Sequence, residues 1–325
     1  MLDARLNGRG LLVVGDVVTD VLALHGHSGP GKGTHGDGAP AGETDTPAHI
    51  TLRPGGSGAN TAAWAASLGT DVRMLARVGR DSGSWHRACL ADAGVRPCLR
   101  IDPERPTAVI VVMVDPAGER TMVTDRGAGA FLGPDDWDDA LLDGVAHVHV
   151  SGYTLFTETG AQLAGLVMST ARRCGVTISV DPASTGFLRA FGPRRFLEAT
   201  AGAGTVLPNR DEARLLAGTT DPGAAAVELA GVYGRAVVKL GREGAVAARR
   251  GGKPMWEAGA PVRAIDSTGA GDAFAAGFLT ACLGGAGDRE AVAAGCRTGA
   301  RAVSRIGGRP GTPPAAGGSG PSAGR

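Results

Sequence analysis

Short apolar runs alternate with helix-like segments along most of the chain. Residues 11–14 are all apolar and stop at Gly15 and Asp16, which is typical of a buried strand that ends at a functional edge. The segments 59–68 and 85–93 are followed directly by Gly69 and Gly94, and they predict helices with a glycine stop. This alternation of strands and helices predicts an α/β fold built on a layered sheet.

The same pattern returns in the second half of the chain. Further helices are expected at 160–173, 210–216, 224–233, 272–283 and 288–304. Further strands are expected at 72–78, 146–150, 176–180, 205–207, 236–240 and 262–265. One layered sheet is therefore expected to run through most of the protein.

The middle of the chain breaks this rhythm. A β-branched run at 107–114 and a shorter run at 121–124 flank the turn residues 115–118, and together they predict a hairpin. The hairpin could pair with an extended segment at 49–52, behind a Gly-, Pro- and Thr-rich loop at 26–48, to form a lid. The expected organisation is a large α/β domain over 1–24, 53–105 and 129–306, a β lid over 25–52 and 106–128, and a disordered tail over 307–325.

The composition is that of a soluble globular protein, with 43% hydrophobic and 20% charged residues among 325. Lys and Arg (33) balance Asp and Glu (32), so no charge excess predicts a nucleic acid or an anionic membrane as partner. No apolar run approaches the roughly 20 residues that span a bilayer. The five cysteines are scattered and form no C-x-x-C pair, and no signal segment is seen, which together favour a cytoplasmic location.

The strongest candidate for chemistry is the turn Gly269-Ala270-Gly271-Asp272. It follows a predicted strand and opens a predicted helix, whose first amides suit a phosphate. Asp272 could then take a proton from an attacking hydroxyl. The turn by itself fits equally well a tight loop in which Asp272 only caps the helix. It is neither a G-K-[ST] phosphate loop nor a G-x-G-x-x-G fingerprint, which makes a nucleotide-dependent dehydrogenase a poor alternative.

Two segments together identify a family. Residues 266–272 resemble the C-terminal signature of the ribokinase-like carbohydrate kinases, the PfkB family, and residues 55–60 resemble the N-terminal signature. They occur in the family's order, and the resemblance extends from Leu11 to Gly307. It implies a ribokinase-like three-layer α/β/α domain with a mainly parallel central sheet and a small β-sheet lid. It also implies ATP as donor, Mg²⁺ as metal and a hydroxymethyl group as acceptor.

The resemblance assigns roles at the acceptor side. Asp272 resembles the catalytic base, and the amides from Gly269, Ala270 and Gly271 onward resemble the anion hole. The residues matching the acceptor site and the lid hinge are Asp16, Asp20, Gly55, Gly56, Asn60 and Arg126. Asp20 and Asn60 could instead cap helices, and Arg126 could pair with Asp125 or solvent rather than with a substrate carboxylate. Val18 departs from family members that carry a polar residue there.

The resemblance also assigns roles at the nucleotide side. Asn209 resembles a residue near the phosphates, and Glu212 a ligand of Mg²⁺ acting partly through water. An ordinary helix start explains that pair too. The residues matching the nucleotide site are Lys239, Gly241, Gly244 and Thr268, although Lys239 could simply be solvated. A monovalent-cation site for K⁺ is expected from backbone carbonyls near Asp266 and Ser304.

The acceptor stays open on this evidence. A ribokinase, a fructokinase and a 2-keto-3-deoxygluconate kinase all fit, and so does a nucleoside kinase similar to adenosine kinase. The lid has few aromatic residues that could stack on a base, which argues mildly against the nucleoside. A non-catalytic ligand-binding protein is a further alternative, against which the intact Asp272 turn argues. The open edge of the lid sheet could pair with a second copy and give a homodimer.

Overall fold

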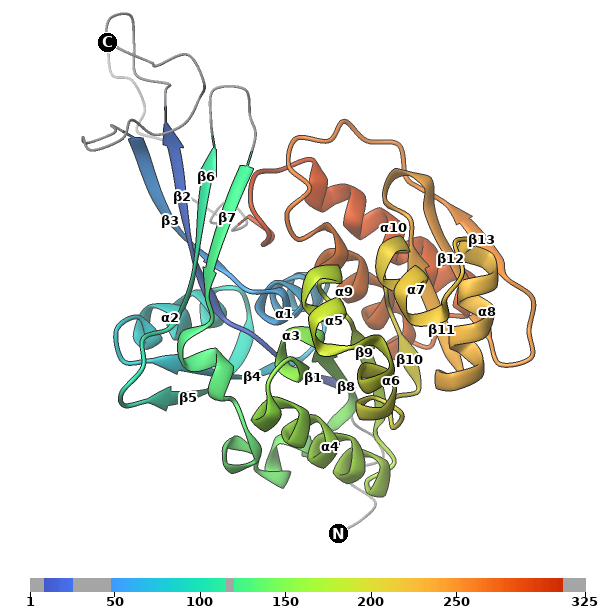
Figure 1. Ribbon diagram of the computed structural model, residues 1–325, viewed down its shortest axis with the longest axis horizontal. Helices are drawn as coiled ribbons and strands as arrows, with labels where there is room; N and C mark the ends of the chain where they lie inside the picture. Colours follow the sequence, from blue (N-terminus) through green and yellow to red (C-terminus); the bar gives the residue numbers. More distant parts are fainter. Residues whose placement is uncertain (1–8, 26–47, 115–119, 312–325) are drawn as a thin grey trace, which may run out of the picture.

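A nine-stranded sheet forms the middle layer of the computed structural model, which describes residues 9–25, 48–114 and 120–311 (Figure 1). The strand order is β13-β12-β11-β10-β9-β8-β1-β4-β5, and all neighbours are parallel except around β12. The strands are β1 (Gly10–Val14), β4 (Val72–Gly79), β5 (Val95–Asp102), β8 (Val145–Ser151), β9 (Thr177–Asp181), β10 (Thr205–Val206), β11 (Arg235–Lys239), β12 (Gly244–Arg249) and β13 (Met255–Ala258).

Helices cover both faces of this sheet. Leu12 and Val14 of β1 enter one core cluster, and Leu11 and Val13 enter the other, because side chains alternate along a strand. The first cluster packs under α3 (Gly152–Leu155), α4 (Glu158–Arg173), α5 (Thr185–Phe191), α6 (Pro193–Ala199), α7 (Arg210–Ala217) and α8 (Pro222–Tyr233). The second packs under α1 (Ser57–Ser67), α2 (Gly83–Asp92), α9 (Ala270–Leu283) and α10 (Asp288–Val303). The expected three-layer α/β/α architecture with a mainly parallel sheet is therefore confirmed.

In the part of the chain that the structure describes, four short 3-10 segments complete the regular structure: η1 (Gly127–Phe131), η2 (Pro134–Asp136), η3 (Asp139–Leu142) and η4 (Gly241–Glu243). Within the described ranges, no helix combines the length and apolarity needed to cross a bilayer.

A second, four-stranded sheet projects from the large domain, and we call it the lid sheet (Figure 1). Its order is β3-β2-β6-β7, with β2 (Val18–His25), β3 (Ala48–Gly55), β6 (Ala108–Val114) and β7 (Arg120–Asp125). The predicted hairpin is present as the antiparallel pair β6–β7. The segment around 49–52 is extended as predicted, but it pairs with β2, and β2 pairs in parallel with β6.

The expected domain boundary at 24–25 needs a correction. Strand β2 lies in the lid sheet, although residues 18–24 were assigned to the large domain. The chain crosses between the two sheets at residues 15–17, directly after β1, so the crossing point carries Asp16. The hairpin turn 115–118, the loop 26–47 and the tail residues 312–325 lie outside the described residues.

The prediction of a strand at 262–265 is wrong. Val262 and Ile265 are 44% and 59% exposed, and the Ile265 amide donates to the Val303 carbonyl at the end of α10 instead of to a neighbouring strand. The other predicted strands and helices of the large domain are present within a few residues of their expected bounds. The pattern did not reveal β5, β12, β13 and the short helices α3, α5 and α6.

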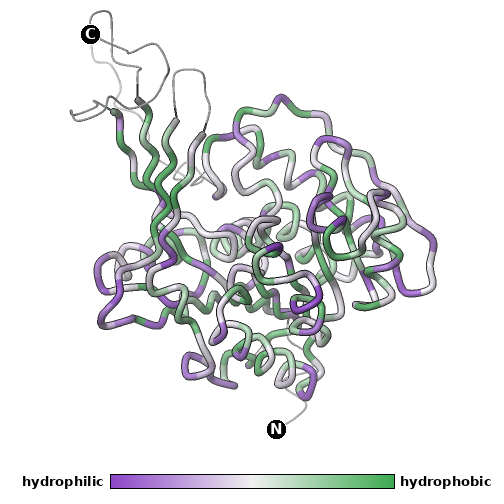
Figure 2. The backbone as a smooth tube through the Cα atoms, viewed as in Figure 1, coloured by the Kyte–Doolittle hydropathy of each residue, from purple (hydrophilic) through white to green (hydrophobic). Residues whose placement is uncertain are grey.

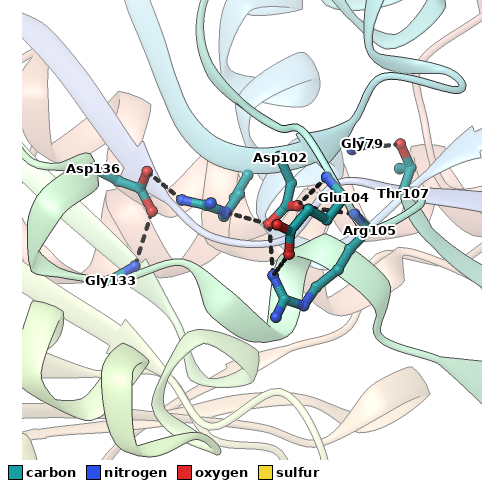
Figure 3. A network of polar contacts seen from close by, with 8 residues as sticks. Gly79, Asp102, Glu104, Arg105, Thr107, Gly133 and Asp136 are labelled. Carbon is teal, nitrogen blue, oxygen red and sulfur yellow. Dashed lines mark hydrogen bonds and ion pairs between the residues drawn. The ribbon is translucent and has the colours of Figure 1, made fainter.

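A polar network fixes the connection that leads from β5 to β6 (Figure 3). Arg77 donates to Asp102 at 3.0 Å and to Asp136 at 2.9 Å, and Asp102 also accepts two backbone amides from residues 104 and 105. Next to it, the Thr107 hydroxyl accepts the amide of Gly79 at 3.0 Å. Charge-assisted hydrogen bonds therefore help to anchor this side of the lid.

Candidate active site

A cavity of about 720 Å³ lies between the lid sheet and the large domain. Its floor is formed where β1, β8 and β9 end, and β1 is the strand at which the chain order reverses, with β8 on one side and β4 on the other. Open parallel sheets bind ligands at such switch points. The lid contributes one face, through Asp20, Leu22 and Ile110 among others.

The first turn of α9 borders this cavity. Gly269 caps the helix with φ 72°, a conformation that favours glycine, and a Cβ there would lie 2.6 Å from Gly308. Ala270 and Gly271 follow, and the first amides of a helix have no partner within it. The turn therefore presents backbone donors and the positive helix end to the cavity.

Asp272 stands in this first turn and is tied to the other glycine-rich segment. Its carboxylate accepts a hydrogen bond from Ser57 Oγ at 2.7 Å and one from Asn60 Nδ2 at 3.0 Å. Burial raises the pKa of Asp272 to about 7, although the hydrogen bonds from Asn60 and Ser57 lower it. The two predicted signatures thus meet at one carboxylate whose proton affinity suits a base at neutral pH.

Asp16 is held by the start of α1. Its carboxylate accepts the amides of Ser57 (2.8 Å) and Gly58 (3.0 Å) and the Ser151 hydroxyl (3.0 Å). Gly56, with φ 98°, sits against it, because a Cβ there would lie 2.5 Å from the Asp16 carbonyl oxygen. The glycine is needed for close packing as well as for any hinge motion.

Asp20 and Arg126 reach the cavity from β2 and from the end of β7. Burial raises the pKa of Asp20 to about 6, opposed chiefly by Arg309. A Cβ on Gly55 would lie 2.2 Å from Asp20 Oδ2, so the absence of a side chain at Gly55 makes room for this carboxylate. Arg126 donates to the carbonyls of Tyr153 and Phe156, and its planar group still borders the cavity.

The opposite end of the cavity gathers Asp181, Asn209, Glu212 and Lys239. Asn209 and Glu212 form a capping box at the start of α7: the Asn209 amide and side chain donate to the two Glu212 oxygens at 2.8 and 2.7 Å. Burial and the neighbouring Asp181 raise the pKa of Glu212 to about 7. Lys239 pairs with Asp181, and the carboxylates around it raise its pKa despite its burial.

The remaining predicted residues divide into two groups. Gly241, Asp266 and Thr268 line the cavity. Asp266 accepts the amide and hydroxyl of Thr268 at 3.0 and 2.7 Å, and its other oxygen accepts the Gly307 amide at 2.9 Å. Gly244 and Ser304 are not among the lining residues: a Cβ on Gly244 would lie 2.0 Å from the Glu257 carbonyl, which assigns that glycine to the contact between β12 and β13.

Several site residues were missed by the sequence analysis. Ser57 lies inside the glycine-rich signature at 55–60, so its position in the sequence could have identified it as a candidate site residue. Asp181 ends β9, and a carboxylate at the end of a buried parallel strand is a usable signal. Ala183, which also lines the cavity, has a positive φ of 68°, as strained residues at functional sites often do.

The segment directly after α10 also belongs to the site. The disordered tail was expected to begin at residue 307, but the Gly308 carbonyl accepts Trp64 Nε1 at 2.9 Å, and Arg309 donates to the Gly55 carbonyl at 3.1 Å. The expected disorder is therefore wrong for residues 307–309. A composition rich in glycine and proline did not reveal contacts that form only in the folded protein.

Comparison with known proteins agrees with this geometry. Residues 11–315 match the family model described as pfkB family carbohydrate kinase. An ATP-dependent ribose-1-phosphate kinase from Halopiger xanaduensis is 34% identical over 232 residues, covering 70% of this chain and 73% of the relative. A fructokinase from Klebsiella pneumoniae is 30% identical and covers 84% of both chains. The solved structure of an adenosine kinase from Sinorhizobium meliloti superimposes with a TM-score of 0.79 at 25% identity, covering 93% of this chain and 95% of its own.

Proposed function

The chain belongs to the pfkB family of carbohydrate kinases, and on that premise we propose how its cavity residues divide the work of phosphoryl transfer. The protein is an ATP-dependent sugar kinase with the ribokinase fold. Asp272 takes the proton from the attacking hydroxymethyl group. The amides at the start of α9, from Gly269 to Asp272, stabilise the charge on the transferring group.

One observation carries this assignment: the Asp272 carboxylate lies in the first turn of a helix whose amides border the same cavity. This arrangement supports a proton acceptor and an anion-binding helix start at one reacting centre. Ser57 and Asn60 fix the carboxylate from the acceptor side. Asp16, Asp20 and Asn60 would hold the acceptor hydroxyls, because carboxylates accept hydroxyl hydrogen bonds and an amide both donates and accepts.

The nucleotide end would use Asn209, Lys239, Gly241 and Thr268. Mg²⁺ prefers oxygen ligands and keeps several waters. The carboxylates of Asp181 and Glu212 fit that preference, since both line the cavity. Both Glu212 oxygens already accept hydrogen bonds from Asn209, which favours contact with the metal through water. The bound metal would neutralise phosphate charge. Lys239 lies next to Gly271, since a Cβ on Gly271 would be 3.3 Å from Lys239 Nζ.

A sugar or a sugar acid is the proposed acceptor. The relatives named above act on ribose 1-phosphate and fructose according to their names. Arg126 borders the acceptor end, and within the described residues it donates hydrogen bonds to the carbonyl groups of Tyr153 and Phe156. Asp125, the expected alternative partner, instead accepts the amide of Gly127. A guanidinium placed this way suits a carboxylate or another anionic substituent of the acceptor.

A nucleoside is the second candidate, and one observation favours it. Tyr153 of α3 and Phe187 of α5 line the cavity with ring centroids 5.7 Å apart in an edge-to-face arrangement. Such rings can stack on a base. The aromatic residues were expected in the lid of a nucleoside kinase, but here they come from the opposite wall. The adenosine kinase among the structural neighbours makes this alternative concrete.

The proposed assembly is a homodimer through the lid. Along the face of the lid sheet that points away from the cavity, Leu52, Val21, Val111 and Val123 form a row across all four strands. Leu52 and Val123 are 60% and 58% exposed, and strand β6 beside β7 is apolar along its length (Figure 2). A second copy would remove this surface from water. A cytoplasmic location is also proposed, supported by five cysteines that are all free thiols.

The decisive test is ADP release from Mg-ATP with a panel of acceptors: D-ribose, D-fructose, ribose 1-phosphate, 2-keto-3-deoxygluconate and adenosine. A sugar or sugar acid should stimulate ADP release and accumulate as a phosphate ester. Stimulation by adenosine alone would replace the sugar with the nucleoside. If none of the five alcohols stimulates release, the proposed acceptor class is wrong.

A further inference from the structure

Residues 307–309 run along one side of the site and contact three of its segments. The Gly307 amide donates to Asp266 at 2.9 Å, and the Gly308 carbonyl accepts Trp64 Nε1 at 2.9 Å. A Cβ on Gly308 would lie 2.5 Å from Asn60 Nδ2, so the backbone passes directly against the acceptor site. Three successive residues thereby connect the loop before α9, helix α1 and the lid hinge.

Arg309 places its guanidinium beneath the lid hinge. One nitrogen donates to the Gly55 carbonyl at 3.1 Å. Its Nε and Nη1 atoms are closed off from solvent and have no hydrogen-bond partner in the described chain. Burial lowers the pKa of Arg309 to about 10, opposed by Cys89, Asp20 and Asp16. A buried cation with one hydrogen bond depends on nearby negative charge.

Asp20 is a partly buried carboxylate that needs a nearby positive charge to stay ionised. Its carboxylate faces the cavity from β2 and lies against Gly55, the residue whose carbonyl accepts from Arg309. Burial alone favours the protonated form of Asp20, which is a poorer acceptor for sugar hydroxyls. Arg309 is the largest influence that favours the charged form, followed by Arg53 on β3, while Asp16 opposes it. Arg309 and Asp20 therefore both lie against Gly55, and the charge of each offsets the effect of burial on the pKa of the other.

We propose that Arg309 is a positioning residue of the acceptor site, whose buried charge keeps the Asp20 carboxylate ionised and directed into the cavity. Arg309 does not itself line the cavity, so it acts through Asp20. Residues 307–309, which follow α10, thereby become part of acceptor recognition. This inference rests on the proposed role of Asp20 in binding acceptor hydroxyls.

The two groups of α2 near Arg309 do not change charge between pH 5 and 8. Burial lowers the pKa of His86 on α2 to about 4 and raises that of the Cys89 thiol, so both are neutral in this range. Asp81, which also acts on His86, accepts hydrogen bonds from Thr107 that lower its pKa. A pH effect transmitted by Arg309 should therefore appear in Asp20.

The test measures acceptor binding as a function of pH in the Asp272→Asn background, where turnover and the titration of Asp272 are both removed. The probe is whichever of D-ribose, D-fructose or 2-keto-3-deoxygluconate stimulates ADP release by the wild type, and its Kd is measured by calorimetry from pH 5 to 9. Arg309→Met is compared with Arg309→Lys and with Arg305→Met, a matched removal of an exposed arginine four residues earlier. Thermal unfolding of each variant confirms that it is folded.

Binding should weaken at low pH as Asp20 becomes protonated, and we call this part of the pH profile the acid limb. Arg309→Met should shift the acid limb upward by about one pH unit, which weakens binding about tenfold at pH 5.5 and leaves it nearly unchanged at pH 9. Arg309→Lys should restore most of the loss, and Arg305→Met should match its background. Adding Asp20→Asn should remove the limb in every variant.

Two results would overturn the inference while leaving the role of Asp20 intact: an unchanged limb in Arg309→Met, or an equal loss at every pH, which is the signature of a structural role. If Asp20→Asn binds the probe normally, the proposed acceptor site is itself wrong, and the inference falls with it.

Discussion

Replacing Asp272 with asparagine separates the charge of this side chain from its shape. Ser57 Oγ and Asn60 Nδ2 donate to the two carboxylate oxygens. An asparagine can accept from Asn60 and donate to the Ser57 hydroxyl, which can turn to accept. The Asp272→Asn variant should therefore fold with the site geometry kept and should bind Mg-ATP with near-normal affinity.

Turnover by this variant should be lost. A positioned base contributes roughly 10²–10⁴-fold to a rate, so kcat should fall at least about a hundredfold. In the wild type, the base must be ionised before it can accept a proton. Because burial raises the pKa of Asp272 to about 7, wild-type kcat should rise with pH through this value and then level off.

The same shift predicts that the inactive variant is more stable. The pKa of Asp272 is about 7 in the folded protein, against an ordinary value of 3.8. Between these values the folded state binds more protons than the unfolded state, so stability falls as pH rises, and it is lowest above pH 7. At about 1.4 kcal/mol for each pH unit, the ionised aspartate costs on the order of 4 kcal/mol above pH 7 and less than half of that at pH 5. Asparagine avoids this cost.

The assay is thermal unfolding of both proteins at pH 5 and pH 8, next to kcat on the acceptor selected by ADP release. The advantage of Asp272→Asn should grow by about 3 kcal/mol between the two pH values, or roughly 5 °C in Tm for a protein of this size. A Tm difference that does not grow with pH would show that Asp272 is not a carboxylate of raised pKa. A variant that retains near-normal turnover would show that Asp272 is not the base.

Three further outcomes are expected. Arg126→Met should weaken kcat/KM for an acidic sugar about tenfold to a hundredfold and spare a neutral sugar, and equal losses on both would remove Arg126 from anion recognition. Leu52→Lys should convert a dimer to a monomer in light scattering, whereas His49→Lys, on the opposite face of β3, should not; a monomeric wild type would contradict the lid dimer. Replacing a bulky organic cation with K⁺ should raise kcat if carbonyls near Asp266 and Ser304 bind it, and an unchanged rate would count against that site.

The site was predictable where its function is local in sequence. A backbone that approaches a phosphate needs small residues, and a base beside it needs one carboxylate, so Gly269 to Asp272 carry a readable pattern. The pattern did not reveal that Ser57 and Asn60, more than 200 residues away, hold that carboxylate. The family resemblance placed both segments at the site, but the hydrogen bonds required the fold.

The parts that could not be predicted depend on contacts between distant segments. Strand β2 contains an apolar run at 21–24 that either sheet could accept, and only its pairing with β3 and β6 assigns it to the lid. The segment at 262–265 has the composition of a strand but finds no neighbouring strand. Gly308 and Arg309 lie in a stretch whose composition suggests disorder, and their order comes from Trp64 and Gly55.

The cavity assigns different tasks to chemically similar carboxylates through their surroundings. Asp16 accepts two backbone amides and a hydroxyl, which suits a fixed structural and hydrogen-bonding role. Asp272 accepts one hydroxyl and one side-chain amide, and these bonds do not offset its burial even with Lys239 nearby, so its pKa rises to about 7 and it can exchange a proton. Asp20 is buried with a cation instead of amides, which makes its charge depend on Arg309. A carboxylate that accepts several backbone amides, as Asp16 does, therefore cannot take over the role of the base. Transferring that role to another aspartate would require a change in its hydrogen-bond donors as well as a new carboxylate.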